Sequence, residues 1–144
     1  MGIEENKATI RRFVEEIPNI GNLAAADQLL ADGFQLHFPE LPPITGSEAF
    51  KEIPTAIRTA FPDLAETIEE LIAEGDRVVE RFTLRGTHLG EFMGIPPTGK
   101  SVSWTGMAEY LLEDGRIAEC WVEANLLGLA LQTGVVSVLR GLLA

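Results

Sequence analysis

Apolar positions repeat with a helical period in the first part of the chain and with a strand-like period in the second. The first helical stripe consists of Ile10, Phe13, Val14 and Ile17, at the i, i+3, i+4 and i+7 spacing of an amphipathic helix. We expect this helix to end at Pro18, because proline has no N–H to donate and its ring clashes with the preceding turn. Two more helices are expected at residues 22–33 and at about 47–61, where Pro54 should cause a kink or a late start.

The second half alternates between apolar and polar residues, as strands with one buried face do. A short strand is expected at residues 34–38, and longer ones at 67–74, 77–87, 101–113 and 116–124. Asp114-Gly115 is the strongest hairpin signal between them. The apolar last twenty residues should be helical in part. Helices followed by an antiparallel meander predict an α+β protein in which residues 1–144 form one domain, with a twisted sheet that curls around the helices and leaves a concave pocket.

The charge balance excludes some partners. Acidic residues outnumber basic ones by 22 to 11 among 144 residues, which gives a net charge of −11 and argues against binding to nucleic acid or to an anionic membrane.

The one cysteine, Cys120, excludes an internal disulfide and a multi-cysteine zinc site. The chain opens with acidic residues rather than a basic and then apolar stretch, so we expect no signal peptide and a cytoplasmic location. We expect no metal and no cofactor.

Four segments carry a more specific signal: GDRVVERFTLRGTHLG at 75–90, GIPPTGK at 94–100, DGRIAECW at 114–121 and LLGLALQTG at 126–134. In this order and spacing they resemble the SnoaL-like polyketide cyclases, and shorter similarities extend the resemblance to about residues 6–134. It implies the cone-shaped fold shared with nuclear transport factor 2, ketosteroid isomerase and limonene epoxide hydrolase. In this NTF2-like fold, three N-terminal helices pack on a strongly curved antiparallel sheet that encloses a pocket. The resemblance also implies a hydrophobic small-molecule ligand and a homodimer.

The resemblance shows which catalytic groups of the family are missing here. In the aromatic-polyketide cyclases an aspartate takes a proton from an activated carbon and returns one to the new alkoxide; its position is Val122. A histidine of those enzymes falls on Ala108. The arginine of limonene epoxide hydrolase matches Arg81, but its two acids fall on Thr83 and Val122. Valine has no proton to exchange, so neither mechanism can operate as it does in those enzymes.

Other side chains would then have to carry any chemistry. The expected catalytic residues are His37 as a base that titrates near neutrality, Arg81 to stabilise developing negative charge, and Tyr110 as a hydrogen-bond donor. The expected substrate-binding residues are Thr83, Trp104, Ala108, Val122 and His88. Strand alternation places Glu80 on the face of its strand opposite to Arg81. The acidic run at 66–70 reads as a solvated strand face.

Each candidate also has a structural reading. His37 suits a hydrogen-bonded strand end, Arg81 an ion pair and Tyr110 a core ring. Two functions therefore stay open. The first is a cofactor-independent enzyme that performs aldol-type ring closure or a proton-transfer isomerisation, with epoxide hydrolysis as a neighbouring possibility. The second is a binding module that keeps the pocket without the acids.

Overall fold

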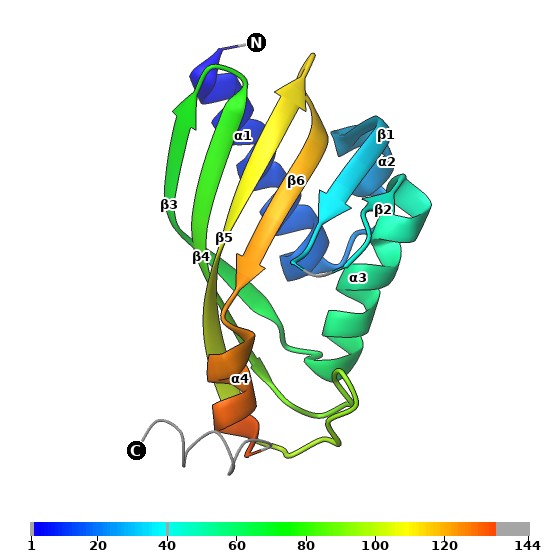
Figure 1. Ribbon diagram of the computed structural model, residues 1–144, viewed down its shortest axis with the longest axis vertical. Coiled ribbons are helices and arrows are strands. Elements are labelled where there is room, and N and C mark those ends of the chain that lie inside the picture. Colours follow the sequence, from blue (N-terminus) through cyan, green and yellow to red (C-terminus); the bar gives the residue numbers. More distant parts are fainter. Residues whose placement is uncertain (1, 40, 135–144) are drawn as a thin grey trace.

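The computed structural model describes residues 2–39 and 41–134, and its centre is a six-stranded curved sheet (Figure 1). The strands are β1 Leu30–His37, β2 Ile44–Thr45, β3 Ala65–Glu74, β4 Arg77–Thr87, β5 Ser101–Glu113 and β6 Arg116–Ala124. They lie in the order β2-β1-β6-β5-β4-β3. All neighbours are antiparallel except β1 and β6, which are parallel, so the sheet is mixed rather than wholly antiparallel as expected.

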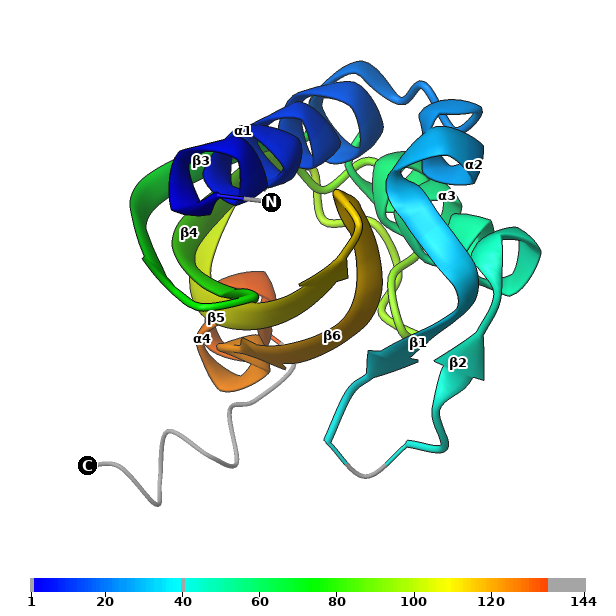
Figure 2. The ribbon, with the colours of Figure 1, turned by 90° about the horizontal axis from the view of Figure 1, so that it is seen from above.

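Helices cover the concave side of this sheet, which confirms the expected α+β cone (Figure 2). The helices of the N-terminal part are α1 Ile3–Val14, α2 Ala25–Leu29 and α3 Ser47–Ala60. The ring of Phe13 on α1 meets the ring of Tyr110 on β5 edge-on, with centroids 5.8 Å apart, and it also contacts Phe50 of α3 at 5.7 Å. The core therefore lies between α1, α3 and the inner face of the long strands.

The first helix does not end at Pro18 as expected. It continues into a π-helical segment, η1 Glu15–Ile20, that contains this proline. Proline removes an N–H that a regular helix would use, and the wider π turn accommodates the chain without that bond. The segment ends at Gly21, whose φ of 83° suits glycine, and the Asn22 N–H then bonds to the Glu16 carbonyl at 2.7 Å.

The second helix is shorter than its pattern suggests, and the first strand begins earlier. β1 starts at Leu30 and includes Gly33, which has a left-handed φ of 74°. Its parallel partner β6 is far along the chain, so the local sequence gives no sign of the pairing. The third helix begins at Ser47 and runs through Pro54, so the late start considered for it is not seen.

Burial along β4 and β5 shows which face of the sheet is inside. Even-numbered residues of both strands are buried, Gly106 excepted, whereas odd-numbered residues are exposed or half-buried. Gly106 leaves room for the ring of Phe82, because a Cβ at this position would clash with the Cζ atom of that ring. We call the buried side the inner face and the other side the outer face.

The last described helix, α4 Leu126–Thr133, covers an unpaired stretch of β5. β6 ends opposite Gly106, so the backbone of Ser103 has no strand partner on that side. The side-chain amide of Gln132 takes that place: Oε1 accepts from the Ser103 N–H at 2.9 Å and Nε2 donates to its carbonyl at 2.6 Å. Of the helix expected in the last twenty residues, α4 is present, and residues 135–144 lie outside the described residues.

No helix within residues 2–39 and 41–134 is both long enough and apolar enough to cross a membrane.

Candidate functional site

Two carboxyl groups meet on the inner face of the sheet. Glu80 on β4 is fully buried, and the hydroxyl of Tyr110 on β5 donates to its Oε1 at 2.9 Å. Glu66 on the edge strand β3 is half-buried as a residue, but its carboxyl reaches inward and is hydrogen-bonded to that of Glu80. Two carboxylates are both acceptors, so this bond requires one proton between them. We call Glu66, Glu80 and Tyr110 the carboxyl–tyrosine cluster.

The surroundings of the cluster favour its protonated forms. Burial raises the pKa of Glu66 well above its usual value, and the neighbouring Glu80 raises it further. Burial also raises the pKa of Glu80, although the hydrogen bonds from Glu66 and Tyr110 lower it in part. The pair therefore holds a shared proton at pH values where exposed carboxyls have lost theirs, and the hydrogen bond that Tyr110 donates favours the negative charge on Glu80.

Two neighbours of the pair remain neutral. Burial raises the pKa of Tyr110 well above its usual value, and the nearby Glu80 adds to the effect, so the phenol keeps its proton and donates it in a hydrogen bond. Burial likewise raises the pKa of the Cys120 thiol. This cysteine is therefore a small buried residue rather than a nucleophile.

Of the residues expected at the site, Tyr110 belongs to this cluster, and Ala108 and Val122 lie beside it. Glu80 is paired with Ala108, and Ala108 is paired with Val122, so the three form one row across β4, β5 and β6 on the inner face. Tyr110 follows two residues after Ala108 on the same face. The side chain of Ala108 is small and buried between those of Glu80 and Val122. The carboxyl of Glu80 thus points into the same interior as Val122.

Trp104 and His88 also lie inside, further toward the loop that joins β4 and β5. Trp104 is 3% exposed, and its ring lies 5.0 Å from that of Phe61. His88 is fully buried, stacks on the same phenylalanine at 5.4 Å and has its Nδ1 3.0 Å from the hydroxyl of Thr98. Its Nε2 has no hydrogen-bond partner among the described residues. The binding role of both residues stays a prediction.

His37 lies on the outer face, away from Tyr110. It ends β1 opposite Trp121, on which its ring stacks with centroids 5.3 Å apart. Its Nε2 lies 2.5 Å from Oε2 of Glu119. This geometry is that of a hydrogen-bonded histidine at a strand end, one of the two readings of the sequence. The expectation that His37 and Tyr110 share one site is wrong, because their partners on β6 are adjacent residues, which point to opposite faces.

Arg81 and Thr83 are also on the outer face. Arg81 is exposed, and the hydroxyl of Thr83 donates to Glu69 on the neighbouring strand at 3.0 Å. The expectation that Arg81 stands in the same interior as Val122 is therefore wrong. Strand alternation was right about which residues share a face, and burial shows that Glu80 rather than Arg81 is on the inner one.

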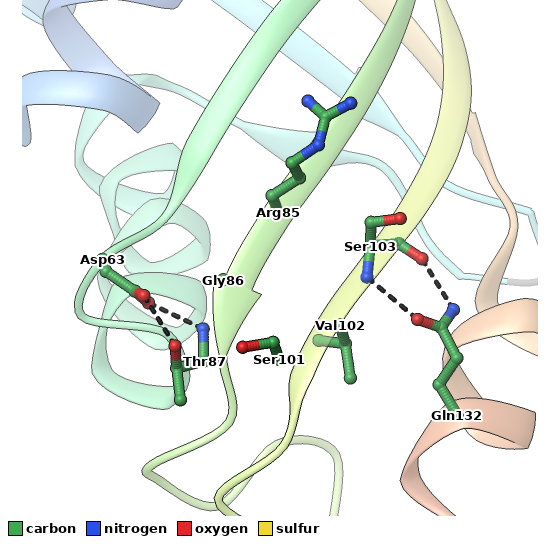
Figure 3. Close-up of a pocket in the computed structure, with 8 residues that line it drawn as sticks. All are labelled: Asp63, Arg85, Gly86, Thr87, Ser101, Val102, Ser103 and Gln132. Atoms are coloured by element: carbon green, nitrogen blue, oxygen red, sulfur yellow. Dashed lines mark hydrogen bonds between the residues drawn. The ribbon is translucent and has the colours of Figure 1, made fainter.

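Two grooves open on the outer face. One, of about 410 Å³, lies between β4, β5 and α4, and most of the residues that line it are polar (Figure 3). Its lining includes Arg85 and Ser101. It also includes two pairs, Asp63–Thr87 and Ser103–Gln132, and within each pair the two residues are hydrogen-bonded to each other. The other groove is lined by Arg81, Thr105, Gly106, Met107, Glu123, Ala124 and Asn125. Neither contains the carboxyl–tyrosine cluster.

The family of SnoaL-like polyketide cyclases matches residues 8–133. The chain belongs to this family. A search of curated proteins finds no match. Among solved structures similar to this SnoaL-like chain is AclR, a proposed hydroxylase from Streptomyces galilaeus, with 29% identity, a TM-score of 0.85 and coverage of 94% of this chain and 85% of AclR. IdmH, a proposed polyketide cyclase from Streptomyces antibioticus, has 31% identity and a TM-score of 0.79 over 90% of this chain and 98% of its own.

A third similar structure is a proposed SnoaL-like polyketide cyclase from Jannaschia sp. CCS1, with 26% identity and a TM-score of 0.84 over 90% of this chain and 92% of its own. These similarities confirm the SnoaL-like family and the NTF2-like cone. The reaction has to be argued from the interior of this chain, since one fold supports many unrelated activities.

Sequence reasoning missed Glu66 and Glu80 as site residues. Glu80 stands among apolar residues in an alternating strand, between Val78 and Phe82, and an acid on the apolar face of a strand is a signal of a paired or functional carboxyl. Glu66 gives no such signal, because it belongs to an acidic run whose other members are exposed. Only the curvature of the sheet brings its carboxyl to Glu80.

Proposed function

We propose that this SnoaL-like chain is an acid–base enzyme that performs an aldol-type ring closure, or a related proton-transfer isomerisation, on an apolar oxygenated small molecule without a cofactor. The observation that carries the proposal is the buried pair Glu66–Glu80, hydrogen-bonded to Tyr110. It supplies a carboxyl to the interior where the family's aspartate position is Val122. Buried carboxyls with raised pKa values are the groups that enzymes use for proton transfer near neutral pH.

The proposed reaction assigns one step to each member of the pair. The ionised Glu80 takes a proton from a carbon flanked by two carbonyls, and the resulting enolate carbon attacks a second carbonyl carbon to form the new C–C bond. The alkoxide oxygen left by that attack takes the proton of Glu66. The hydrogen bond between the carboxyls then passes the proton from Glu80 to Glu66, which restores the starting state.

Tyr110 supports the base rather than replacing it. Its hydroxyl donates to Oε1 of Glu80, which leaves the buried Oε2 as the oxygen that the proposal assigns to proton transfer. The residues around the cluster are mainly apolar. Val122 and Ala124 are partly buried apolar residues that pack against the core, so the ligand that suits them is itself largely apolar.

Exchange of a carbon-bound proton in simple model compounds tests this function. We expect the wild-type protein to accelerate deuterium uptake from D2O at the central carbon of cyclic β-diketones and β-ketoesters, followed by NMR. Epoxides in the same panel should not be hydrolysed, because Arg81 lies on the outer face of the sheet and Glu80 on the inner face, so the two cannot act on one substrate. Binding seen as chemical-shift changes without any exchange would contradict the enzyme and favour the binding module.

The binding module is the second candidate function. Val122 and Ala108 favour it, since two positions at which the family carries ionisable groups are now apolar. On that reading the carboxyl–tyrosine cluster would only hold β3, β4 and β5 together. The exchange measurement separates the two candidates because it requires a base in contact with the ligand.

We also propose a homodimer formed by the outer face of the sheet. Met107 is 48% exposed and Ile72 is 59% exposed, and both stand on that face, Met107 on the strand next to that of Trp121 and Ile72 on the edge strand β3. Sedimentation should give about twice the 15.7 kDa mass of the chain, and Met107→Lys should shift the protein toward the single-chain mass. A wild-type mass of one chain would contradict the dimer.

A further inference from the structure

We propose that Asn19 is a positioning residue, which holds the edge strand β3 at Glu66 and thereby keeps the Glu66 carboxyl against Glu80. The inference deepens the proposed function, because it names what sets the geometry of the proton-transfer pair. Asn19 touches neither carboxyl; it acts through the backbone that carries one of them.

The side-chain amide of Asn19 satisfies both backbone groups of Glu66. Its Oδ1 accepts from the Glu66 N–H at 2.6 Å, and its Nδ2 donates to the Glu66 carbonyl at 3.0 Å. β3 is the edge strand of the sheet, so these two groups have no strand partner on that side. The amide thus takes the place of a seventh strand at the residue that supplies the second carboxyl.

The π-helical segment places Asn19 at this position. A regular helix could not contain Pro18 without strain, and the wider turn carries the following residue toward the start of β3. Arg58 of α3 fixes the turn, since its Nη1 donates to the Pro18 carbonyl at 2.6 Å and to the Asn19 carbonyl at 3.1 Å. Helix α3, the π turn and β3 are therefore joined by hydrogen bonds that end at Glu66.

Glu66 needs this restraint because its carboxyl has an alternative, solvent-facing position. The register of β3 against β4 shifts between Ile68 and Glu70, so only a short regular stretch ties Glu66 to the sheet on its other side. The residue is half-exposed, and water would solvate its carboxyl better than the interior does. Without the amide of Asn19, the carboxyl would turn outward and leave Glu80.

Titration of the pair tests this role in the absence of any substrate. Glu66 and Glu80 act on each other, Tyr110 donates a hydrogen bond to Glu80, and both glutamates raise the pKa of the neighbouring Cys120 thiol. In Asn19→Ala, followed by 13C NMR of the glutamate carboxyls, we expect the pKa of Glu66 to fall because its carboxyl gains water. The pKa of Glu80 should rise, because it loses the hydrogen bond from Glu66 that lowers it. A substrate that shows turnover should lose about tenfold to a hundredfold in kcat, with little change in KM.

Asn22→Ala is the matched control. Asn22 lies just after the same segment and donates to Glu16 at 2.7 Å, in an exposed contact far from the pair, so both titrations should stay as in the wild type. Asn19→Ser is the second variant: it keeps a hydrogen-bonding hydroxyl without adding a charge, and it should give intermediate shifts even if Asn19→Ala fails to fold.

Two results would overturn the role of Asn19. One is wild-type titration of both carboxyls in whichever Asn19 variant folds, and the other is an equal change in Asn22→Ala. Since titration needs no turnover, absence of proton exchange by the wild type would reject the proposed function and leave this inference decided by the NMR data.

Discussion

Glu80→Gln is expected to lower turnover by about two to four orders of magnitude, the range that a positioned general base contributes. The amide has nearly the shape of the carboxyl, and it can still accept the hydrogen bond from Tyr110 at the place where Oε1 lies now. It cannot take a proton from carbon. The rate of deuterium uptake into a β-dicarbonyl substrate, measured at saturating concentration, should therefore fall while binding of the same substrate is kept.

Glu109→Gln is the control for this loss. Glu109 lies on β5, next in sequence to Ala108, but it points to the outer face and forms an ion pair with Arg77 at 2.6 Å. Its replacement removes the same charge from the neighbouring position, and turnover should remain within about twofold of the wild type, as is usual for a weak surface ion pair. Unchanged exchange in Glu80→Gln would show that another group is the base.

Glu66→Gln is expected to stabilise the protein at mildly alkaline pH, by about 1.4 kcal/mol for each unit by which the pKa of Glu66 is higher in the folded protein than in the unfolded chain. The pKa of Glu66 is higher in the folded protein than in the unfolded chain, because of burial and the nearby Glu80. The folded state thus binds more protons, and the free energy of unfolding falls as the pH rises from the ordinary value of about 4.3 through the raised one. A glutamine has no proton to lose in this window.

Urea unfolding at several pH values checks the sign of this effect. The free energy of unfolding of the wild type should decrease with rising pH more steeply than that of Glu66→Gln, and the two should converge below the ordinary pKa. Glu123→Gln, on the exposed outer face of β6, should follow the slope of the wild type. A parallel pair of curves for Glu66→Gln and the wild type would mean that Glu66 is ionised and solvated in the folded state.

Asp63 changes the stability of the protein with pH in the opposite direction to Glu66, because its pKa is lowered. The backbone N–H and the hydroxyl of Thr87 both donate to its carboxylate, which the turn before β3 places beside the end of β4. Stability from this contact is lost as the pH falls through the lowered value. The group is exposed, so its contribution is small beside that of the buried pair.

Hydrophobic periodicity alone determined much of the fold. The spacing of Ile10, Phe13 and Val14 predicted the first helix, and Asp114-Gly115 predicted the hairpin of β5 and β6. Both signals depend only on residues that are close together in the sequence. Alternation along β4 also grouped its residues correctly into two faces. The family resemblance, carried by segments from 75 to 134, indicated the cone and is confirmed.

Only the tertiary structure decided which of the two faces of β4 is inside, and with it the composition of the site. Strand alternation has two equivalent solutions, and burial against α1 and α3 selects the one with Glu80 inward and Arg81 outward. The meeting of Glu66 with Glu80, the support from Asn19 and the parallel pairing of β1 with β6 join residues that are far apart in the chain. Such contacts depend on how the sheet curves and on where the helices pack. A local sequence pattern predicts neither the curvature nor the packing.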